Sequence, residues 1–450
     1  MTSVITAPEG SRRPAHGTAA AALRHRDFRI LWLGLFASNV GTWMQTLVLP
    51  AYIADRTNSA LWVGLFAFAQ MGPLLLLSIP GGMLAERFPR KTWMIILQAE
   101  QLLLAVAVAA LVAADSALMW LFLTQLLIGI GNALNAPVLQ STLPNLVDVR
   151  DLPGAISLNS VMINGSRVIG PAIAAVLMTR GVTAPQIFVL NAVTYLFVIV
   201  ALVVITVPVL AKATDAQGWA NVLHGVRIAR RRTIVGRLLV GMALFSFLCL
   251  PYVGLFPIMV KQAFDVASIS STYKWLYAVW GLGACLGALS IGTFLAQTDK
   301  RRLIAPFFIG FAVSLTAFAL LRSAGPAFPV GFLLGFCYFG LATSMLTVVQ
   351  QNLRSTERAR VMSLWFMAFG GMVSIGALAF GPIVDAIGAR GVMLLGAVAA
   401  LGLAWWCDVS RRAVSTLDDE AAAEGDQVAG HTLQTRGAAG LDEHGVSAGE

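Results

Sequence analysis

Two stretches of the chain read GGMLAERFPRK (Gly81–Lys91, the first hairpin) and GTFLAQTDKRR (Gly292–Arg302, the second hairpin). They align without a gap, and each ends a long apolar segment with a short basic turn before the next apolar segment begins. A charged hairpin between two apolar helices belongs at a membrane surface, where backbone polar groups regain water and arginine side chains reach phosphates. The pair therefore predicts a membrane protein made of two related halves.

The composition supports this interpretation. Of the 450 residues, 58% are hydrophobic and only 12% are charged, whereas about a quarter of the residues in soluble domains are charged. The net charge of +9 does not indicate nucleic-acid binding, because the basic residues lie in short turns between apolar runs. The four cysteines all lie inside apolar segments, without the spacing of a metal site or a disulfide framework: Cys249, Cys285, Cys337 and Cys407.

Apolar runs of about 20 residues are each long enough to cross the hydrocarbon core of a bilayer. Twelve such runs follow one another along the chain. Their approximate limits are 28–54, 60–84, 92–114, 117–138, 159–180, 186–207, 238–261, 273–296, 303–322, 327–349, 361–384 and 391–407.

The distribution of Lys and Arg predicts the topology. With both ends in the cytoplasm, 24 basic residues lie inside and 6 outside, and with Arg167 inside a span these make up the 31 in the chain. The positive-inside rule therefore predicts a multi-pass protein of the cell inner (plasma) membrane with both termini cytoplasmic. The predicted units are a cytoplasmic tail (1–26), a six-helix bundle (27–207), a cytoplasmic linker (208–236), a second six-helix bundle (237–407) and a disordered cytoplasmic tail (408–450).

The first hairpin resembles the signature loop of the major facilitator superfamily, G-x-L-A-D-R-x-G-R-K. The matching residues are Gly82, Leu84, Ala85, Glu86, Arg87, Arg90 and Lys91, with Glu86 where Asp is usual and Pro89 where Gly is usual. Two further stretches, Ala136–Pro171 and Glu357–Leu364, resemble the branch that contains enterobactin exporters and macrolide-efflux proteins. The resemblance implies an all-α membrane protein, with twelve transmembrane helices in two six-helix bundles around a central cavity.

The hairpin residues are candidates for a gate. Their basic side chains can pair with inner-loop carboxylates when the inner side is closed, and the paired glycines permit close helix packing. The alternative is that the charges only set topology. The candidate gating residues are Gly81, Gly82, Glu86, Arg87, Arg90, Lys91, Arg301 and Arg302.

Two charged residues inside spans are candidates for proton coupling. Glu100 lies in the third span, and Arg167 shares one helical face with Ser160, Asn164 and Pro171 in the fifth. Charged groups are costly at membrane depth and commonly mark ion pathways. The alternative is structural: Glu100 would bond a neighbouring helix, and Arg167 would bond carbonyl groups between the bundles.

Polar and aromatic side chains recur at helical spacing on spans that are expected to surround the cavity. Such residues are individually more often packing than binding residues, but together they predict a broad amphipathic pocket. The candidates are Asn39, Trp43, Gln125, Asn132, Asn164, Tyr252, Tyr277, Trp280, Tyr338, Trp365 and Phe369.

Together with these observations, the resemblance implies a secondary active transporter, and most directly a proton-coupled exporter working by alternating access. Its expected substrate is a partly apolar small molecule: a siderophore, a macrolide-like drug or a lipophilic metabolite. The sequence contains no P-loop, nucleophile–base pair or metal-ligand spacing, so we expect neither an enzyme nor a cofactor or metal. The expected partners are the substrate, protons and the lipid bilayer, with no nucleic acid, and we expect a monomer. An importer or symporter, or a non-transporting receptor or scaffold, remains an alternative.

Overall fold

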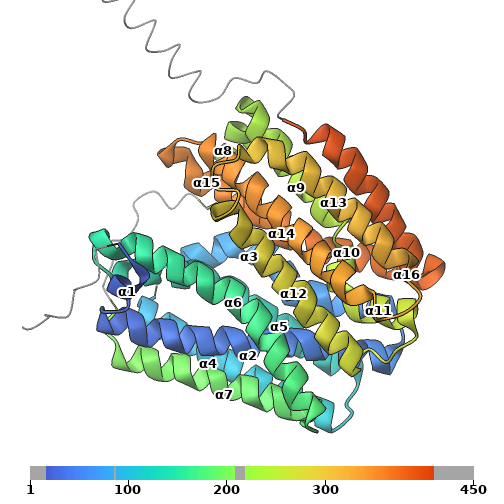
Figure 1. Cartoon of the computed structure of the whole chain (residues 1–450). Coiled ribbons are helices and arrows are strands. Elements are labelled where there is room, and N and C mark those ends of the chain that lie inside the picture. The colour runs from blue at the N-terminus through green and yellow to red at the C-terminus, as the bar shows by residue number, and fades with distance from the viewer. Residues whose placement is uncertain (1–16, 86–87, 208–217, 410–450) are drawn as a thin grey trace, which may run out of the picture.

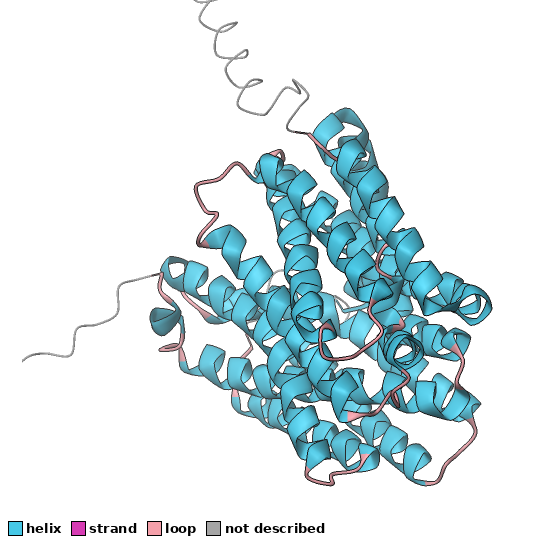
Figure 2. Ribbon diagram, turned by 45° about the vertical axis from the view of Figure 1, so that its right-hand side comes forward, coloured by secondary structure: helices cyan, strands magenta, loops and turns pink. Residues whose placement is uncertain are grey.

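The computed structural model describes residues 17–85, 88–207 and 218–409, and every regular element among them is helical (Figure 2). Apolar segments of this length become helices because a helix satisfies its backbone hydrogen bonds internally, as lipid requires. The first half contains α1 (Ala19–Ala22), α2 (Arg26–Thr57), α3 (Ala60–Ala85), α4 (Arg90–Ala113), α5 (Leu118–Thr142), the 3-10 turns η1 (Leu143–Leu146) and η2 (Val149–Asp151), α6 (Leu152–Thr179) and α7 (Ala184–Val204).

The helices of the second half follow one another in a similar order, but they are interrupted more often. It contains α8 (Gly218–Arg231), α9 (Thr233–Leu248), α10 (Pro251–Gly254), α11 (Phe256–Phe264), α12 (Ser271–Gly292), α13 (Lys300–Leu320), α14 (Ala327–Gln351), α15 (Ser355–Phe366), the π-helical turn η3 (Met367–Gly371) and α16 (Met372–Trp406). Figure 1 shows the two halves side by side, with α1, α8 and α15 toward one end of the molecule.

The expected spans are not matched one to one by the helices. Nine helical stretches in the described part of the chain are long and apolar enough to cross a membrane. Helix α2 is long enough, but polar residues such as Asn39 and Gln45 reduce its mean hydropathy. The expected seventh span is divided into α9, α10 and α11. The last two expected spans meet within α16, where the helix is broken by a kink at Gly388, whose φ is +82°. That backbone conformation is open to glycine and strained for other residues.

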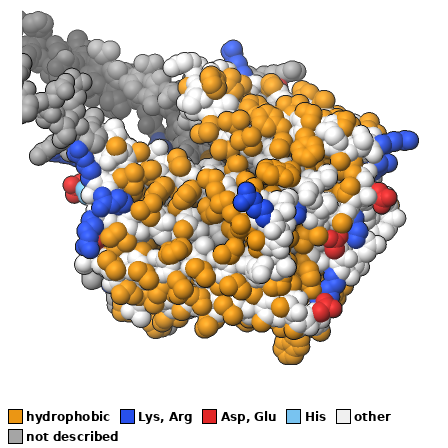
Figure 3. Space-filling view, turned by 60° about the horizontal axis from the view of Figure 1, so that its bottom comes forward, with side chains coloured by type: hydrophobic (Ala, Val, Ile, Leu, Met, Phe, Trp, Pro, Cys, Tyr) orange, Lys and Arg blue, Asp and Glu red, His pale blue; other side chains and the backbone are white. Residues whose placement is uncertain are grey.

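The surface fits a lipid environment. Large apolar side chains are exposed along the helices, including Val398 (68% exposed) and Trp405 (74%). Figure 3 shows hydrophobic side chains covering most of one face, with many of the charged side chains toward its edges. A soluble monomer rarely exposes so large an apolar area, so this surface is the expected contact with acyl chains.

The hydrophobic core joins the two halves at one end of the molecule. One buried cluster combines residues of α2 and α3, such as Leu47 and Val63, with residues of the second half, such as Leu255 and Ile258. A separate cluster around Phe28 and Leu35 contains residues of the first half only, at the end where α1 lies. The first half therefore shares a core with the second half at the end opposite α1, while its cluster near α1 contains no residue of the second half; we call these ends the closed end and the α1 end.

Candidate functional site

A carboxylate of the second half binds the first turn of α3 at the closed end. Asp385 of α16 accepts hydrogen bonds from Ser59 Oγ (3.0 Å), Ala60 N (2.7 Å) and Leu61 N (3.1 Å). The first N–H groups of a helix have no partner within the helix, and a carboxylate there also interacts favourably with the helix dipole. Asp385 therefore acts as an N-terminal cap supplied by the opposite half.

A second carboxylate makes the reciprocal contact. Asp55, near the end of α2, accepts hydrogen bonds from Ser268 N (2.8 Å) and Ile269 N (3.0 Å), just before α12. Lys261 Nζ lies 3.6 Å from Asp55 Oδ1, and both side chains are about one-quarter exposed, at 26% and 28%. We call Asp55 and Asp385, with the groups they bind, the latch.

Close backbone packing continues the interface inward from the latch. The Tyr273 hydroxyl donates to the Leu47 carbonyl oxygen at 3.1 Å, linking α12 to α2. A Cβ atom added to Gly64 would lie 2.5 Å from the Ala377 carbonyl oxygen, so α3 and α16 approach in a way that only glycine permits there. The closed end is thus fastened by hydrogen bonds and by helix packing.

Arg167 lies where the two halves meet. Its guanidinium carbon is 4.9 Å from the centre of the Trp43 ring on α2 and 4.4 Å from that of Phe339 on α14. The α6 backbone at Arg167 also packs against Gly281 of α12, where an added Cβ would be 3.4 Å from the Arg167 carbonyl oxygen. Nε and Nη1 of the guanidinium are buried and have no hydrogen-bond partner among the described residues.

The polar candidates of the first half hydrogen-bond within their own helices or line a small cavity. Asn164 Nδ2 donates to the Ser160 carbonyl oxygen, and Asn39 Nδ2 donates to that of Leu35, each within its own helix. Gln125 is buried on α5. It lines a small cavity together with Gln45, Thr46, Leu49, Pro50, Phe66 and Gln70.

Most of the aromatic candidates of the second half pack against one another. Trp280 Nε1 donates to the Tyr252 hydroxyl at 3.2 Å, and the Trp280 ring stacks with that of Tyr338 at 6.1 Å between centres. Tyr338 also stacks with Phe369, which is partly exposed. Tyr277 and Trp365 are buried. This packing accounts for the burial of the cluster, and a binding role for any of its members remains a proposal.

Glu100 is half-buried in α4 and faces α5. Gln101 Nε2 donates to Glu100 Oε2 at 3.1 Å, and a Cβ added to Gly131 would clash with that oxygen. No ion pair joins Glu100 to Arg167 in the ranges that the structure describes. Asn132 lies on α5 beside this contact and is partly exposed.

Lys91 and Arg301 of the two hairpins make contacts within their own halves. Lys91 Nζ donates to the carbonyl oxygens of Val203 and Ile205 at 2.9 Å each, which caps the end of α7. Arg301 Nε lies 3.7 Å from Asp299 Oδ1 in the second hairpin. Arg90 begins α4 and Arg302 lies in the first turn of α13. Glu86 and Arg87 lie outside the described residues, as do the side-chain surroundings of Gly81 and Gly82.

The second half has its own charged cluster near α8. Arg232 Nε lies 3.1 Å from Glu357 Oε2. These residues line a pocket of about 460 Å³ together with His224, Ile228, Arg231, Arg354 and Arg360. Glu357, a carboxylate of an inner loop, is therefore engaged by an arginine of its own half.

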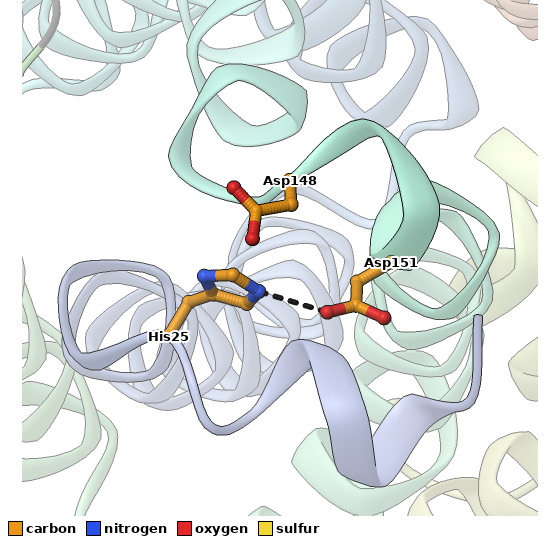
Figure 4. A group of neighbouring side chains, drawn as sticks. All are labelled: His25, Asp148 and Asp151. Carbon is orange, nitrogen blue, oxygen red and sulfur yellow. Dashed lines mark hydrogen bonds and ion pairs between the residues drawn. The ribbon is translucent and has the colours of Figure 1, made fainter. Parts of the chain in front are cut away.

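Three potential metal ligands come together near α1, although their sequence spacing gave no such indication. His25, Asp148 and Asp151 place one ligand atom each within 4.8 Å of one another (Figure 4). His25 Nε2 donates to Asp151 Oδ2 at 3.0 Å, and Gly17 N donates to Asp151 Oδ1 at 3.0 Å. These bonds attach the segment before α2 to the connection between α5 and α6, which is a structural role.

A family model described as "Transmembrane secretion effector" matches residues 17–438. Among curated proteins, the chain is 24% identical to the Staphyloferrin A transporter of Staphylococcus aureus, covering 78% of this chain and 87% of the relative. It is 24% identical to Macrolide efflux protein A of Streptococcus pyogenes, covering 84% and 95%. It is 23% identical to the Enterobactin exporter EntS of Salmonella typhimurium, covering 76% and 81%.

A solved structure shares the fold. The nucleoside transporter NupG superimposes with a TM-score of 0.68 at 13% sequence identity, over 85% of this chain and 98% of that one. Fold, helix pattern and family match together define a membrane transporter of the major facilitator superfamily. Within that superfamily, the chain belongs to the transmembrane secretion effector family, which confirms the resemblance seen in the hairpin and in the fourth-to-fifth span region.

Proposed function

We propose that this protein exports a partly apolar small molecule across the cell inner membrane in exchange for protons, by alternating access, with both termini in the cytoplasm. The observation that carries the proposal is the asymmetric interface. The two halves are latched through Asp55 and Asp385 at the closed end, whereas the first-half cluster at the α1 end contains no residue of the second half.

The latch fits a protein that changes which end is open. Each carboxylate binds backbone N–H groups of the opposite half, so a rocking motion of the two halves breaks both sets of hydrogen bonds without unfolding any helix. Water can replace these bonds because both sites lie at helix ends. With the positive-inside topology, the closed end faces outward and the α1 end opens to the cytoplasm, where an exporter collects its substrate.

The substrate classes follow from the relatives. A staphyloferrin transporter, a macrolide-efflux protein and an enterobactin exporter are similar over most of this chain, and they favour a siderophore, a macrolide-like drug or another lipophilic metabolite. Glu100 is our candidate proton carrier because it is a half-buried carboxylate inside a span. We assign the opening and closing of the α1 end to the hairpin residues, which include Arg90, Arg301 and Arg302.

Transport by membrane vesicles tests this proposal. Inside-out vesicles that contain the protein should accumulate a siderophore or lipophilic drug when their interior is acidified, and a proton-conducting uncoupler should abolish the accumulation. Vesicles with the Asp55→Asn, Asp385→Asn double variant should accumulate less, since the outer closure is weakened. Accumulation only by right-side-out vesicles would reverse the proposed direction.

A further inference from the structure

Arg167 carries a positive charge that no carboxylate of the described chain balances. The salt bridges of the described residues do not include it. The ionisable side chains nearest to it are Tyr277, Tyr338 and Cys285, which are uncharged at neutral pH and so do not neutralise it. Two of its guanidinium nitrogens are buried without a hydrogen-bond partner. Buried N–H donors of a cation are costly to leave in this way unless something else pairs with them.

The two flanking rings meet only part of this requirement. Cation–π contact with Trp43 and Phe339 stabilises the charge. This contact leaves the N–H donors of Nε and Nη1 unused. A ring packs on the face of the guanidinium, whereas the guanidinium donates its hydrogen bonds within its own plane. The side chain is therefore held in place by the rings and retains the donors with which arginine recognises planar anions.

The position of Arg167 suits a substrate group. It joins α6 and α2 of the first half to α14 of the second, so an anion bound there contacts elements of both halves. Ser160 and Asn164 continue the same face of α6 toward the α1 end and are exposed or partly exposed, and Arg167 itself keeps partial exposure. Polar side chains thus continue along this face of α6 as far as the guanidinium. An apolar surface adjoins it, because the ring of Phe369 contacts that of Phe339 at 6.2 Å between centres.

We propose that Arg167, held between Trp43 and Phe339, is the binding site for an anionic group of the substrate, which is an organic acid with an apolar or aromatic body. This rests on the proposed transport function and refines it. The anion pairs with the guanidinium, and its apolar body lies against the surrounding rings. A basic drug is disfavoured by the same charge. Among the proposed classes, the site selects acidic siderophores or acidic lipophilic metabolites over cationic macrolide-like drugs.

The test uses a matched pair of fluorescent probes that differ in one charge. Dansylglycine carries a carboxylate, and dansylglycinamide has nearly the same shape without it. Binding to the purified full-length protein in lipid nanodiscs is followed by energy transfer from tryptophan to the dansyl group, with empty nanodiscs correcting for partition into lipid. A hydrogen bond to a charged group corresponds to a tenfold or larger effect on affinity, so dansylglycine should bind at least about tenfold more tightly than the amide.

Two variants distinguish anion binding at Arg167 from a general attraction of the protein for anions. Arg167→Gln should reduce the preference for dansylglycine to about twofold or less while leaving amide binding unchanged. Arg180→Gln removes an exposed arginine from the end of the same helix and should keep the preference. Because Arg167→Gln can impair folding, the wild-type comparison and Arg167→Lys, which retains the charge and should retain a preference of several-fold, stand as independent measurements.

Equal affinity of the wild-type protein for the two probes would overturn the proposal. So would an unchanged preference in folded Arg167→Gln. Either result leaves transport untouched if vesicles still accumulate a substrate. Conversely, an anion preference that depends on Arg167 in a protein that transports none of the tested compounds would support the site and contradict the proposed export function.

Discussion

Removal of the Asp385 carboxylate should open the closed end. Asp385→Ala removes all three hydrogen bonds to the first turn of α3, from Ser59 Oγ, Ala60 N and Leu61 N. A hydrogen bond to a charged group contributes about 1.5–3 kcal/mol when shielded. Asp385 is exposed, and water takes over the freed N–H groups, so the loss approaches that of an exposed N-cap, typically about 1 kcal/mol and up to about 2.

A loss of about 1–2 kcal/mol of interaction free energy shifts the equilibrium between the latched and unlatched states of this end by a factor of about 5 to 30. The shift can be measured by double electron–electron resonance between spin labels on Thr179→Cys and Ser323→Cys, one exposed site in each half. Cys285, the native cysteine that is not buried, is replaced by Ala in this background. We expect Asp385→Ala to transfer population from the shorter to the longer distance.

Asp265→Asn is the control. Asp265 is also an exposed aspartate of the second half, following α11, and its side chain is not part of the latch. Its backbone is left-handed (φ +50°), which asparagine tolerates and alanine does not, so this variant removes the charge without straining the connection to α12 and should give the wild-type distance distribution. If Asp385→Ala also gives the wild-type distribution, the Asp385 carboxylate does not hold the two halves together.

Topology, proton coupling and the gate are each open to a separate test. Cysteines placed at Ser323 and His224 should react with an impermeant thiol reagent added outside intact cells at the first position only, and the reverse pattern would contradict the topology. Glu100→Gln should abolish accumulation driven by a pH gradient while preserving counterflow exchange, because the amide resembles a permanently protonated acid; unaltered pH-driven accumulation would exclude Glu100 as the carrier. Arg90→Ala should slow vesicle transport several-fold and more than Arg301→Ala, since the second hairpin has Gln297 where the first has the carboxylate of Glu86; equal rates would restrict both residues to setting topology.

Much of the fold could be predicted because lipid allows few alternatives. A long apolar run must be helical, so the expected span 186–207 corresponds to α7 (Ala184–Val204) and 327–349 to α14 (Ala327–Gln351). The interruption of the seventh span was missed, although Pro251 and Pro257, each in the first turn of the helix that follows a break, mark it in the sequence. Helix α8 was missed because its polar sequence resembles a linker; its amphipathic packing against α15 depends on a segment more than 120 residues away.

The partners of the polar residues were less predictable. Asp55 and Asp385 each bind backbone groups of the opposite half, 213 and 325 residues away along the chain. Backbone donors leave no side-chain pattern, so no spacing could indicate these contacts. For Arg167, the sequence identified a costly charge within a span, but the rings that hold it come from two other helices, one in each half.

Proton-driven transport by the purified protein tests the central claim most directly. The full chain is reconstituted into proteoliposomes, and molecules facing inside-out are selected by inactivating the others with a bulky impermeant thiol reagent at Ser323→Cys, which faces the bath only in right-side-out molecules. An acidic lumen is then imposed in the presence of a labelled acidic siderophore. The account predicts accumulation above the external concentration, its collapse on addition of a proton-conducting uncoupler, and its loss in Glu100→Gln. Equilibration of the siderophore to the external concentration and no further, with the pH gradient intact, would contradict it.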